Sequence, residues 1–128
     1  MEVRSTRHSK YNINYHLVWI PKYRRPVLTG EVATHLSDIL HTIADKKDVE
    51  ILSLEIMPDH IHLFISSPPQ NAPSLLVNWF KGISARMFNY WYTGTHLKWT
   101  NSYYVGTAGT VTAETIKKYI EEDRKTHV

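Results

Sequence analysis

Residues 57–65 read MPDHIHLFI, and this stretch decides how the rest of the sequence is interpreted. Successive side chains of an extended chain point to opposite faces, so His60 and His62 share one face of a strand. Ile61, Leu63 and Ile65 then share the other face. The stretch therefore predicts a strand that is buried on one side and carries two neighbouring imidazoles on the side that can line a cleft.

The flanking segments complete an alternation of strands and helices. Apolar periodicity predicts strands over residues 11–20, 49–56, 57–65 and 97–105, and helices over residues 31–47, 75–92 and from about 112 onward. The order β-α-β-β-α-β with one added helix is the ferredoxin-like, split βαβ pattern of an α+β protein. We expect one domain over residues 1–128, with an antiparallel sheet and two helices on one of its faces.

Composition narrows the classes of protein that need to be considered. The sequence has no cysteine, which excludes disulfides, thiolate zinc sites and cysteine nucleophiles. It contains no apolar run of membrane-spanning length, so a cytoplasmic protein is expected. The net charge of +3 permits a nucleic-acid partner, and the first 25 residues are the basic part of the chain, with six Lys and Arg against Glu2 alone.

The two histidines suit a divalent cation, but spacing alone leaves the alternatives open. Single histidines on strands are usually hydrogen-bonded surface or core groups, and the spacing of His60 and His62 can be coincidence. On the predicted C-terminal helix, Tyr119 and Asp123 are four residues apart and project from one face. Taken alone, Tyr119 is more typical of helix packing and Asp123 of solvated surface.

Five segments in this order resemble one known family: YHLVWIPKYRRPVL, MPDHIHLFI, WFKGISARMF, NSYYVGTAGT and IKKYIEED. They look like the small single-tyrosine HUH transposases of insertion sequences, the TnpA family. HUH denotes histidine, bulky hydrophobic residue, histidine, which here is His60, Ile61 and His62. The resemblance extends from about Tyr11 to Asp123.

The resemblance implies a reaction and a set of site residues. Tyr119 matches the nucleophile, and Asp123 matches the residue that helps His60 and His62 hold a metal ion. Many family members carry Gln at the position of Asp123; a carboxylate suits Mg²⁺ or Mn²⁺ at least as well. The implied chemistry is cleavage and rejoining of single-stranded DNA at element ends through a 5′-phosphotyrosine.

The resemblance also implies partners. In the family, the regions that match Lys22, Tyr23, Arg24 and Arg25, and Lys81 and Arg86 on the second helix, face DNA hairpins. A homodimer with shared active sites and a cytoplasmic, nucleoid-associated location follow in the same way. From the residues alone, the turn at 22–25 can also be a solvated turn, and Lys81 and Arg86 ordinary exposed helix residues.

Two other functions fit parts of the same pattern. The β-α-β-β-α-β order is shared with non-catalytic RNA- or single-stranded DNA-binding modules of the RNA-recognition type, although their glycine-aromatic strand motif is missing here. A domesticated relative that cleaves its own repeats without moving an element is the third interpretation.

Overall fold

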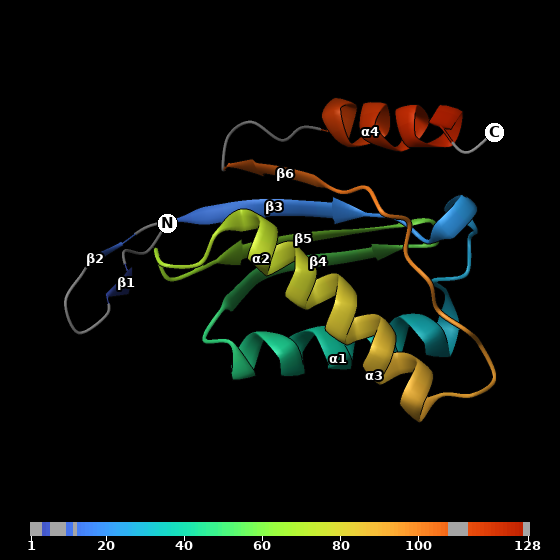
Figure 1. Ribbon diagram of the computed structural model, residues 1–128, viewed down its shortest axis with the longest axis horizontal. Helices are drawn as coiled ribbons and strands as arrows, with labels where there is room; N and C mark the ends of the chain where they lie inside the picture. Colours follow the sequence, from blue (N-terminus) through green and yellow to red (C-terminus); the bar gives the residue numbers. More distant parts are fainter. Residues whose placement is uncertain (1–3, 6–9, 12, 108–112, 127–128) are drawn as a thin grey trace.

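Four antiparallel strands form the central sheet (Figure 1). The sheet order is β4 (Glu50–Met57), β5 (His60–Ser66), β3 (Asn14–Trp19) and β6 (Tyr104–Thr107). This computed structural model describes the backbone of residues 4–5, 10–11, 13–107 and 113–126, and the side chains of residues 13–107 and 114–122. Counted along the chain, these four strands lie in the sheet in the order second, third, first and fourth, which is the order of the ferredoxin-like fold. The predicted fold class is therefore confirmed.

One face of this sheet carries the main core. In the antiparallel register Leu63 lies opposite Leu17 on one side and Leu54 on the other. The side chains of this face are fully buried in the two central strands: Leu17, Trp19, Ile61, Leu63 and Ile65. The predicted division of the histidine strand into a buried and a polar face is therefore correct.

Helix α1 (Gly30–Lys46) covers this core face. Its buried side chains recur at helical spacing: Leu36, Ile39, Leu40, Ile43 and Ala44. Lys47 follows as the C-cap residue, and its backbone amide donates to the carbonyls of Ile43 and Ala44. Its ammonium lies 4.6 Å from the centre of the Trp79 ring of the neighbouring helical segment. The predicted helix 31–47 is thus confirmed to within one residue at each end.

The second helical region is continuous but not uniform. It runs through α2 (Pro73–Asn78), a π-helical turn η2 (Trp79–Ile83) and α3 (Ser84–Trp91). The Ser84 hydroxyl donates to the Lys81 carbonyl and accepts from the Trp99 indole. The wide turn, which the sequence did not predict, therefore connects this helix to the segment that leads into β6.

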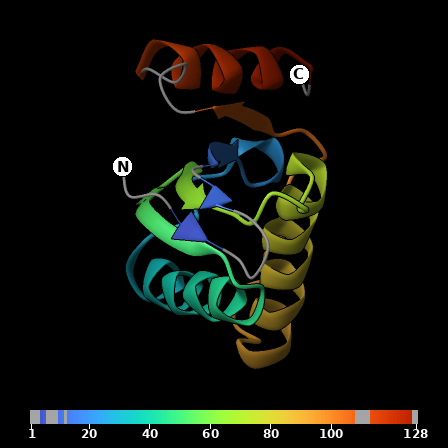
Figure 2. The ribbon, with the colours of Figure 1, turned by 90° about the vertical axis from the view of Figure 1, so that its left-hand side faces the viewer.

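Helix α4 (Ala113–Thr126) lies apart from the other helices, along β6 on the side of the molecule away from α1 (Figures 1 and 2). Ile120 of α4 is only 6% exposed. Val18 and Ile20 are fully buried although they do not belong to the main core cluster. A second, smaller apolar region therefore exists outside the helix-covered core. Helix α4 also contacts the short 3₁₀ turn η1 (Lys22–Arg24).

The fourth predicted strand is shorter than expected. Strand β6 begins at Tyr104, whereas the prediction began at Leu97. Before β6, the chain makes only a single bridge between Trp99 and Pro21, and the Thr100 amide donates to the Ile20 carbonyl. Residues 101–103 then depart from the sheet, because the Thr100 and Ser102 carbonyls are held by the Lys81 ammonium instead.

The N-terminal segment also differs from the prediction. Tyr11 belongs to a separate pair of short strands, β1 (Arg4–Ser5) and β2 (Lys10–Tyr11), so the central strand begins only at Asn14. The predicted start of the last helix, near residue 112, falls within residues 108–112, which lie outside the described residues. In the described part of the chain, no helix combines the length and apolarity that a membrane span requires.

Candidate active site

The sheet face opposite the main core carries the histidine pair. His62 of β5 lies directly opposite Glu55 of β4 and Val18 of β3, and Val18 lies opposite Tyr104 of β6. Directly paired residues of antiparallel strands point to the same face. A single row therefore crosses the sheet from Glu55 through His62 to Tyr104.

A third histidine belongs to this face. His16 Nδ1 and His62 Nε2 are 2.8 Å apart and share a hydrogen bond. The His16 ring also stacks on Phe64, with 4.1 Å between ring centroids. Burial and the nearby His62 lower the pKa of His16, and burial lowers the pKa of His62 against the opposing effect of Glu55. The lowered pKa values favour the neutral form of both rings, and in the hydrogen bond between them one nitrogen donates and the other accepts.

Asp59 connects the histidine strand to the basic turn. Its carboxylate accepts from His60 Nδ1 at 2.9 Å and from Arg24 Nε at 2.8 Å. Burial on its own raises the pKa of Asp59, but these hydrogen bonds outweigh it and leave the pKa below its usual value. Asp59 thus fixes the His60 ring and the Arg24 guanidinium with respect to each other.

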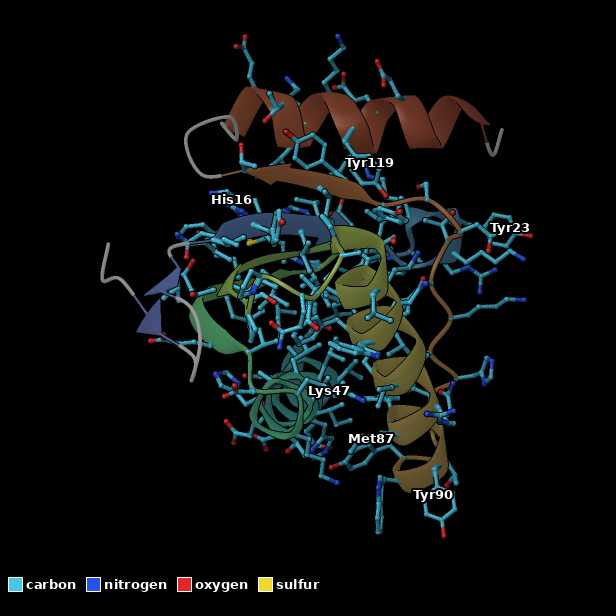
Figure 3. The ribbon with its side chains drawn as sticks, turned by 60° about the vertical axis from the view of Figure 1, so that its left-hand side comes forward. His16, Tyr23, Lys47, Met87, Tyr90 and Tyr119 are labelled. Carbon is cyan, nitrogen blue, oxygen red and sulfur yellow. The ribbon has the colours of Figure 1, made fainter. Side chains whose placement is uncertain are left out.

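Tyr119 lies on the side of α4 that is turned toward the sheet (Figure 3). Its hydroxyl shares a 2.8 Å hydrogen bond with Ser102 Oγ. Its ring lies 6.5 Å from the ring of Tyr104, centroid to centroid. Because Tyr104 belongs to the row that contains His62, α4 presents the Tyr119 phenol beside the face of the sheet that carries the histidines.

Lys81 supports the residue that holds the phenol. Its ammonium donates to the carbonyls of Thr100, at 2.6 Å, and Ser102, at 2.9 Å. The same ammonium lies 5.7 Å from the centre of the Tyr103 ring. Lys81 is half-buried and has a structural role at this position; the DNA contact expected for it stays a prediction.

The other expected DNA-binding residues lie on the surface. Tyr23 is 58% exposed and points away from the body of the protein (Figure 3), with the Lys22 ammonium 5.4 Å and the Arg25 guanidinium 5.6 Å from its ring centre. Arg24 is drawn back toward Asp59. Arg86 is exposed on α3.

Comparison with known proteins identifies the family. The family model described as transposase, IS200 like, matches residues 9–123. The ISDra2 transposase TnpA of Deinococcus radiodurans is 41% identical, with 94% of this chain and 91% of the relative covered. The chain belongs to the IS200-like transposase family.

Further relatives agree with this membership. A transposase for insertion sequence element IS200 of Salmonella typhimurium is 35% identical over 94% of this chain and 86% of the relative. The crystal structure of a putative transposase from Deinococcus radiodurans superposes with a TM-score of 0.86, 37% identity and coverage of 93% and 96% of the two chains. A REP-associated tyrosine transposase bound to a REP hairpin shares the fold, with a TM-score of 0.58, 14% identity and coverage of 98% and 76%.

The residues of this IS200-like transposase fit a divalent metal ion in their chemistry. His60 and His62 offer imidazole nitrogens on one face, with side chains 17% and 14% exposed. The Glu55 carboxylate lies 3.9 Å from His62 Nδ1. Among the side chains that the structure describes, no three His, Cys, Asp or Glu converge on one point. The side chain of Asp123, the expected third ligand, lies outside those described.

Three residues of the site were not assigned by the sequence: His16, Asp59 and Ser102. The position of His16 on the first strand was visible, but its contact with His62 depends on the register between β3 and β5. Asp59 is adjacent to His60 in sequence, which is the signal by which it could have been found. Ser102 had no such signal, since its contact with Tyr119 joins two segments through their packing.

Proposed function

We propose that this transposase cleaves and rejoins single-stranded DNA at the ends of an insertion element, with Tyr119 as the nucleophile. The observation that supports the proposal most is the placement of the Tyr119 phenol beside the sheet face that carries His60 and His62. Membership in the IS200-like family adds the substrate class, since these enzymes act on DNA.

The reaction is a balanced exchange of phosphate esters. The Tyr119 oxygen loses its proton and forms a bond to phosphorus, and the bond between phosphorus and the 3′ oxygen breaks. The departing 3′ oxygen gains a proton, and the 5′ phosphate stays on the tyrosine. Because the energy of the ester is kept in the phosphotyrosine, a second 3′ hydroxyl can attack it and join strands without ATP.

A phenol with a reference pKa of about 10 is a weak nucleophile near neutral pH, so help from the site is required. His60, His62 and Asp123 would hold the Mg²⁺ or Mn²⁺ ion of this site. The ion supplies charge neutralisation and orientation at the scissile phosphate. The chain's own contribution is to hold the two imidazoles: Asp59 fixes the His60 ring and His16 fixes the His62 ring.

The DNA partner we propose is single-stranded DNA that folds into hairpins. Lys22, Arg24 and Arg25 supply cations and Tyr23 an exposed ring, a combination suited to phosphates and unstacked bases. Arg86 on α3 and Lys81 complete the proposed contacts. The hairpin in the structure of the REP-associated relative supports this type of substrate for the fold. We also propose that the protein associates with the nucleoid, because its substrate is DNA.

We further propose a homodimer in which α4 of one subunit serves the histidines of the other. Helix α4 lies at the side of the molecule along β6, away from the main core (Figure 2). In sequence, its connection to β6 contains Gly109 among small residues, and a glycine there suits a change of position.

One assay tests the proposed activity. The protein is incubated with labelled hairpin-bearing single-stranded DNA and Mg²⁺ or Mn²⁺, and products are separated on a denaturing gel. A covalent adduct that is lost in Tyr119→Phe supports the proposal. Binding without an adduct under both metals would instead favour a non-catalytic, RNA-recognition-like binding module.

A further inference from the structure

A small pocket lies between η1 and the segment that precedes β6. Its volume is about 250 Å³, and its lining includes Lys22, Tyr23, Arg25, His96 and Lys98. It is smaller than the roughly 300–1,000 Å³ of pockets for drug-sized ligands. We call it the Tyr23 pocket. Its size suits one small planar group rather than a duplex stem.

The charges around the Tyr23 pocket are of one sign. Lys22, Arg25 and Lys98 line it, and no carboxylate belongs to its lining. Interaction with Lys22 lowers the pKa of Lys98. The Lys22 amide donates to the Lys98 carbonyl at 2.9 Å, which keeps the two residues side by side. Two like charges held together in this way favour an anion between them.

The backbone holds the tyrosine ring in the pocket's wall. Tyr23 and Arg24 have φ angles of 62° and 51°, in the left-handed region that non-glycine residues seldom adopt. The turn is fixed by the Arg24 amide, which donates to the Pro21 carbonyl at 2.8 Å, and by the ion pair of Arg24 with Asp59. Strain that is held in place by such contacts is typical of functional sites. The strained turn presents the exposed ring of Tyr23 next to cations.

The pocket is connected to the candidate active site. Asp59 joins Arg24 of η1 to His60, and α4 contacts η1 (Figure 1). A strand that lies in the site and continues along this edge would therefore pass η1.

We propose that the Tyr23 pocket binds one unpaired nucleotide of the substrate DNA, with its base against the Tyr23 ring and its phosphate between Lys22 and Lys98. The choice of DNA as the ligand rests on the proposed function. The pocket adds His96 and Lys98 to the proposed DNA contacts, and it restricts the bound group to a single base that is not in a duplex.

Fluorescence anisotropy with two labelled DNA probes tests this assignment. One probe is a hairpin with a short single-stranded tail, and the other is the same hairpin with the tail paired by a complementary strand. All proteins carry Tyr119→Phe so that binding is measured without covalent reaction. The added substitutions are Lys98→Gln, Tyr23→Leu and Tyr23→Phe, with Lys46→Gln on the exposed C-terminal turn of α1 as the matched charge control.

Lys98→Gln should weaken binding of the tailed probe about tenfold and reduce the slope of log K against log salt by roughly 0.7. Tyr23→Leu should weaken it by about tenfold, because stacking of one base contributes about 1–3 kcal/mol. Tyr23→Phe keeps the ring and should bind like the parent, as should Lys46→Gln. The fully paired probe should respond little to any of these changes.

Two results would overturn the assignment: unchanged binding of the tailed probe by both Lys98→Gln and Tyr23→Leu, or equal losses for both probes. Circular dichroism checks that each variant is folded. The outcome is separable from that of the adduct assay. If the wild type forms the adduct but the substitutions leave binding of the tailed probe unaffected, the assignment of the pocket alone is refuted. If the substitutions selectively weaken binding of the tailed probe but the wild type forms no adduct, the proposed enzymatic activity alone is refuted.

Discussion

His16 is the residue that most changes the interpretation of the site. The sequence predicts only that it lies on the first strand and packs or hydrogen-bonds near the cleft, and the structure joins it to His62 through a 2.8 Å hydrogen bond. Outer partners of ligating histidines orient the ring, and their loss typically costs about 10–100-fold in metal affinity or activity. His16 is thus a positioning residue for His62.

Replacement of His16 by phenylalanine tests this role. The His16→Phe ring can still stack on Phe64, but it cannot hydrogen-bond to His62. We expect the rate of adduct formation to fall by about tenfold. We expect the free energy of unfolding to fall by only about 1 kcal/mol, the typical net value of one hydrogen bond. The measurements are single-turnover kinetics on denaturing gels and urea unfolding.

His41→Phe is the matched control, because His41 is exposed on α1 and far along the sequence from the site. An adduct rate for His16→Phe equal to that of this control would show that His16 does not position His62.

At the residue scale, a stability measurement also tests whether Lys81 has a structural role in addition to its proposed DNA contact. Its ammonium donates to two carbonyls of the segment that leads into β6, and Lys81→Met leaves both without this charged partner. Hydrogen bonds to charged groups contribute about 1.5–3 kcal/mol, so we expect a loss of about 2 kcal/mol in the free energy of unfolding. Chemical denaturation measures it.

Arg86→Met is the comparison variant for Lys81→Met. Arg86 is exposed on α3, and its replacement should change stability by no more than about 0.5 kcal/mol. Equal stabilities of the two variants would mean that the Lys81 contacts are not structural.

At the scale of elements, strongly patterned segments were predictable and edge segments were not. The alternation in residues 60–65 and the helical spacing in α1 are local properties, and both predictions were correct. The start of the predicted strand 97–105 was wrong, because Lys81 and Ser84 from a distant helix hold this part of the chain. The π-helical turn depends on the same contacts, which no local pattern encodes.

Helix α4 should be the least firmly held element, because it is outside the main core. Ile120 is its buried anchor, at 6% exposed. Ile120→Ala should make opening of α4 easier by about 2 kcal/mol, which corresponds to roughly 30-fold faster amide exchange in this helix. Hydrogen exchange by mass spectrometry measures this, and α1 should not change.

Lys117→Ala, at an exposed position of α4, should leave the exchange of both helices as in the wild type. If Ile120→Ala accelerated exchange equally in α1 and α4, the helix would be part of the main cooperative core, contrary to this account.

At the scale of the whole molecule, the sequence predicted the fold order and the family but not the contacts between segments. The histidine pair and Tyr119 were recognised from the ordered motifs, and the family model confirms the membership. Asp59, the partner of His60, is its neighbour in sequence, whereas the contacts of His16 with His62 and of Ser102 with Tyr119 emerge only when distant segments are placed in space. The arrangement of two subunits is a further level, which a single chain does not specify.

Mixed subunits test the proposed sharing of active sites. His62→Ala lacks a metal ligand and Tyr119→Phe lacks the nucleophile, so neither protein alone should form the adduct. If α4 acts on the partner's histidines, mixed dimers formed by co-expression should recover about half of the sites, each combining one intact tyrosine with one intact histidine pair. No recovery in a verified mixed dimer would show that each subunit uses its own tyrosine.

The central claim is that the Tyr119 oxygen becomes bonded to DNA, and peptide mapping of the covalent adduct tests it most directly. After nuclease treatment and trypsin digestion, residues 119–124, YIEEDR, form a separate peptide that begins with Tyr119. We predict that mass spectrometry finds the nucleotide remnant on this peptide. A remnant on a peptide that contains Tyr103 and Tyr104, or on any other tyrosine, would contradict the account.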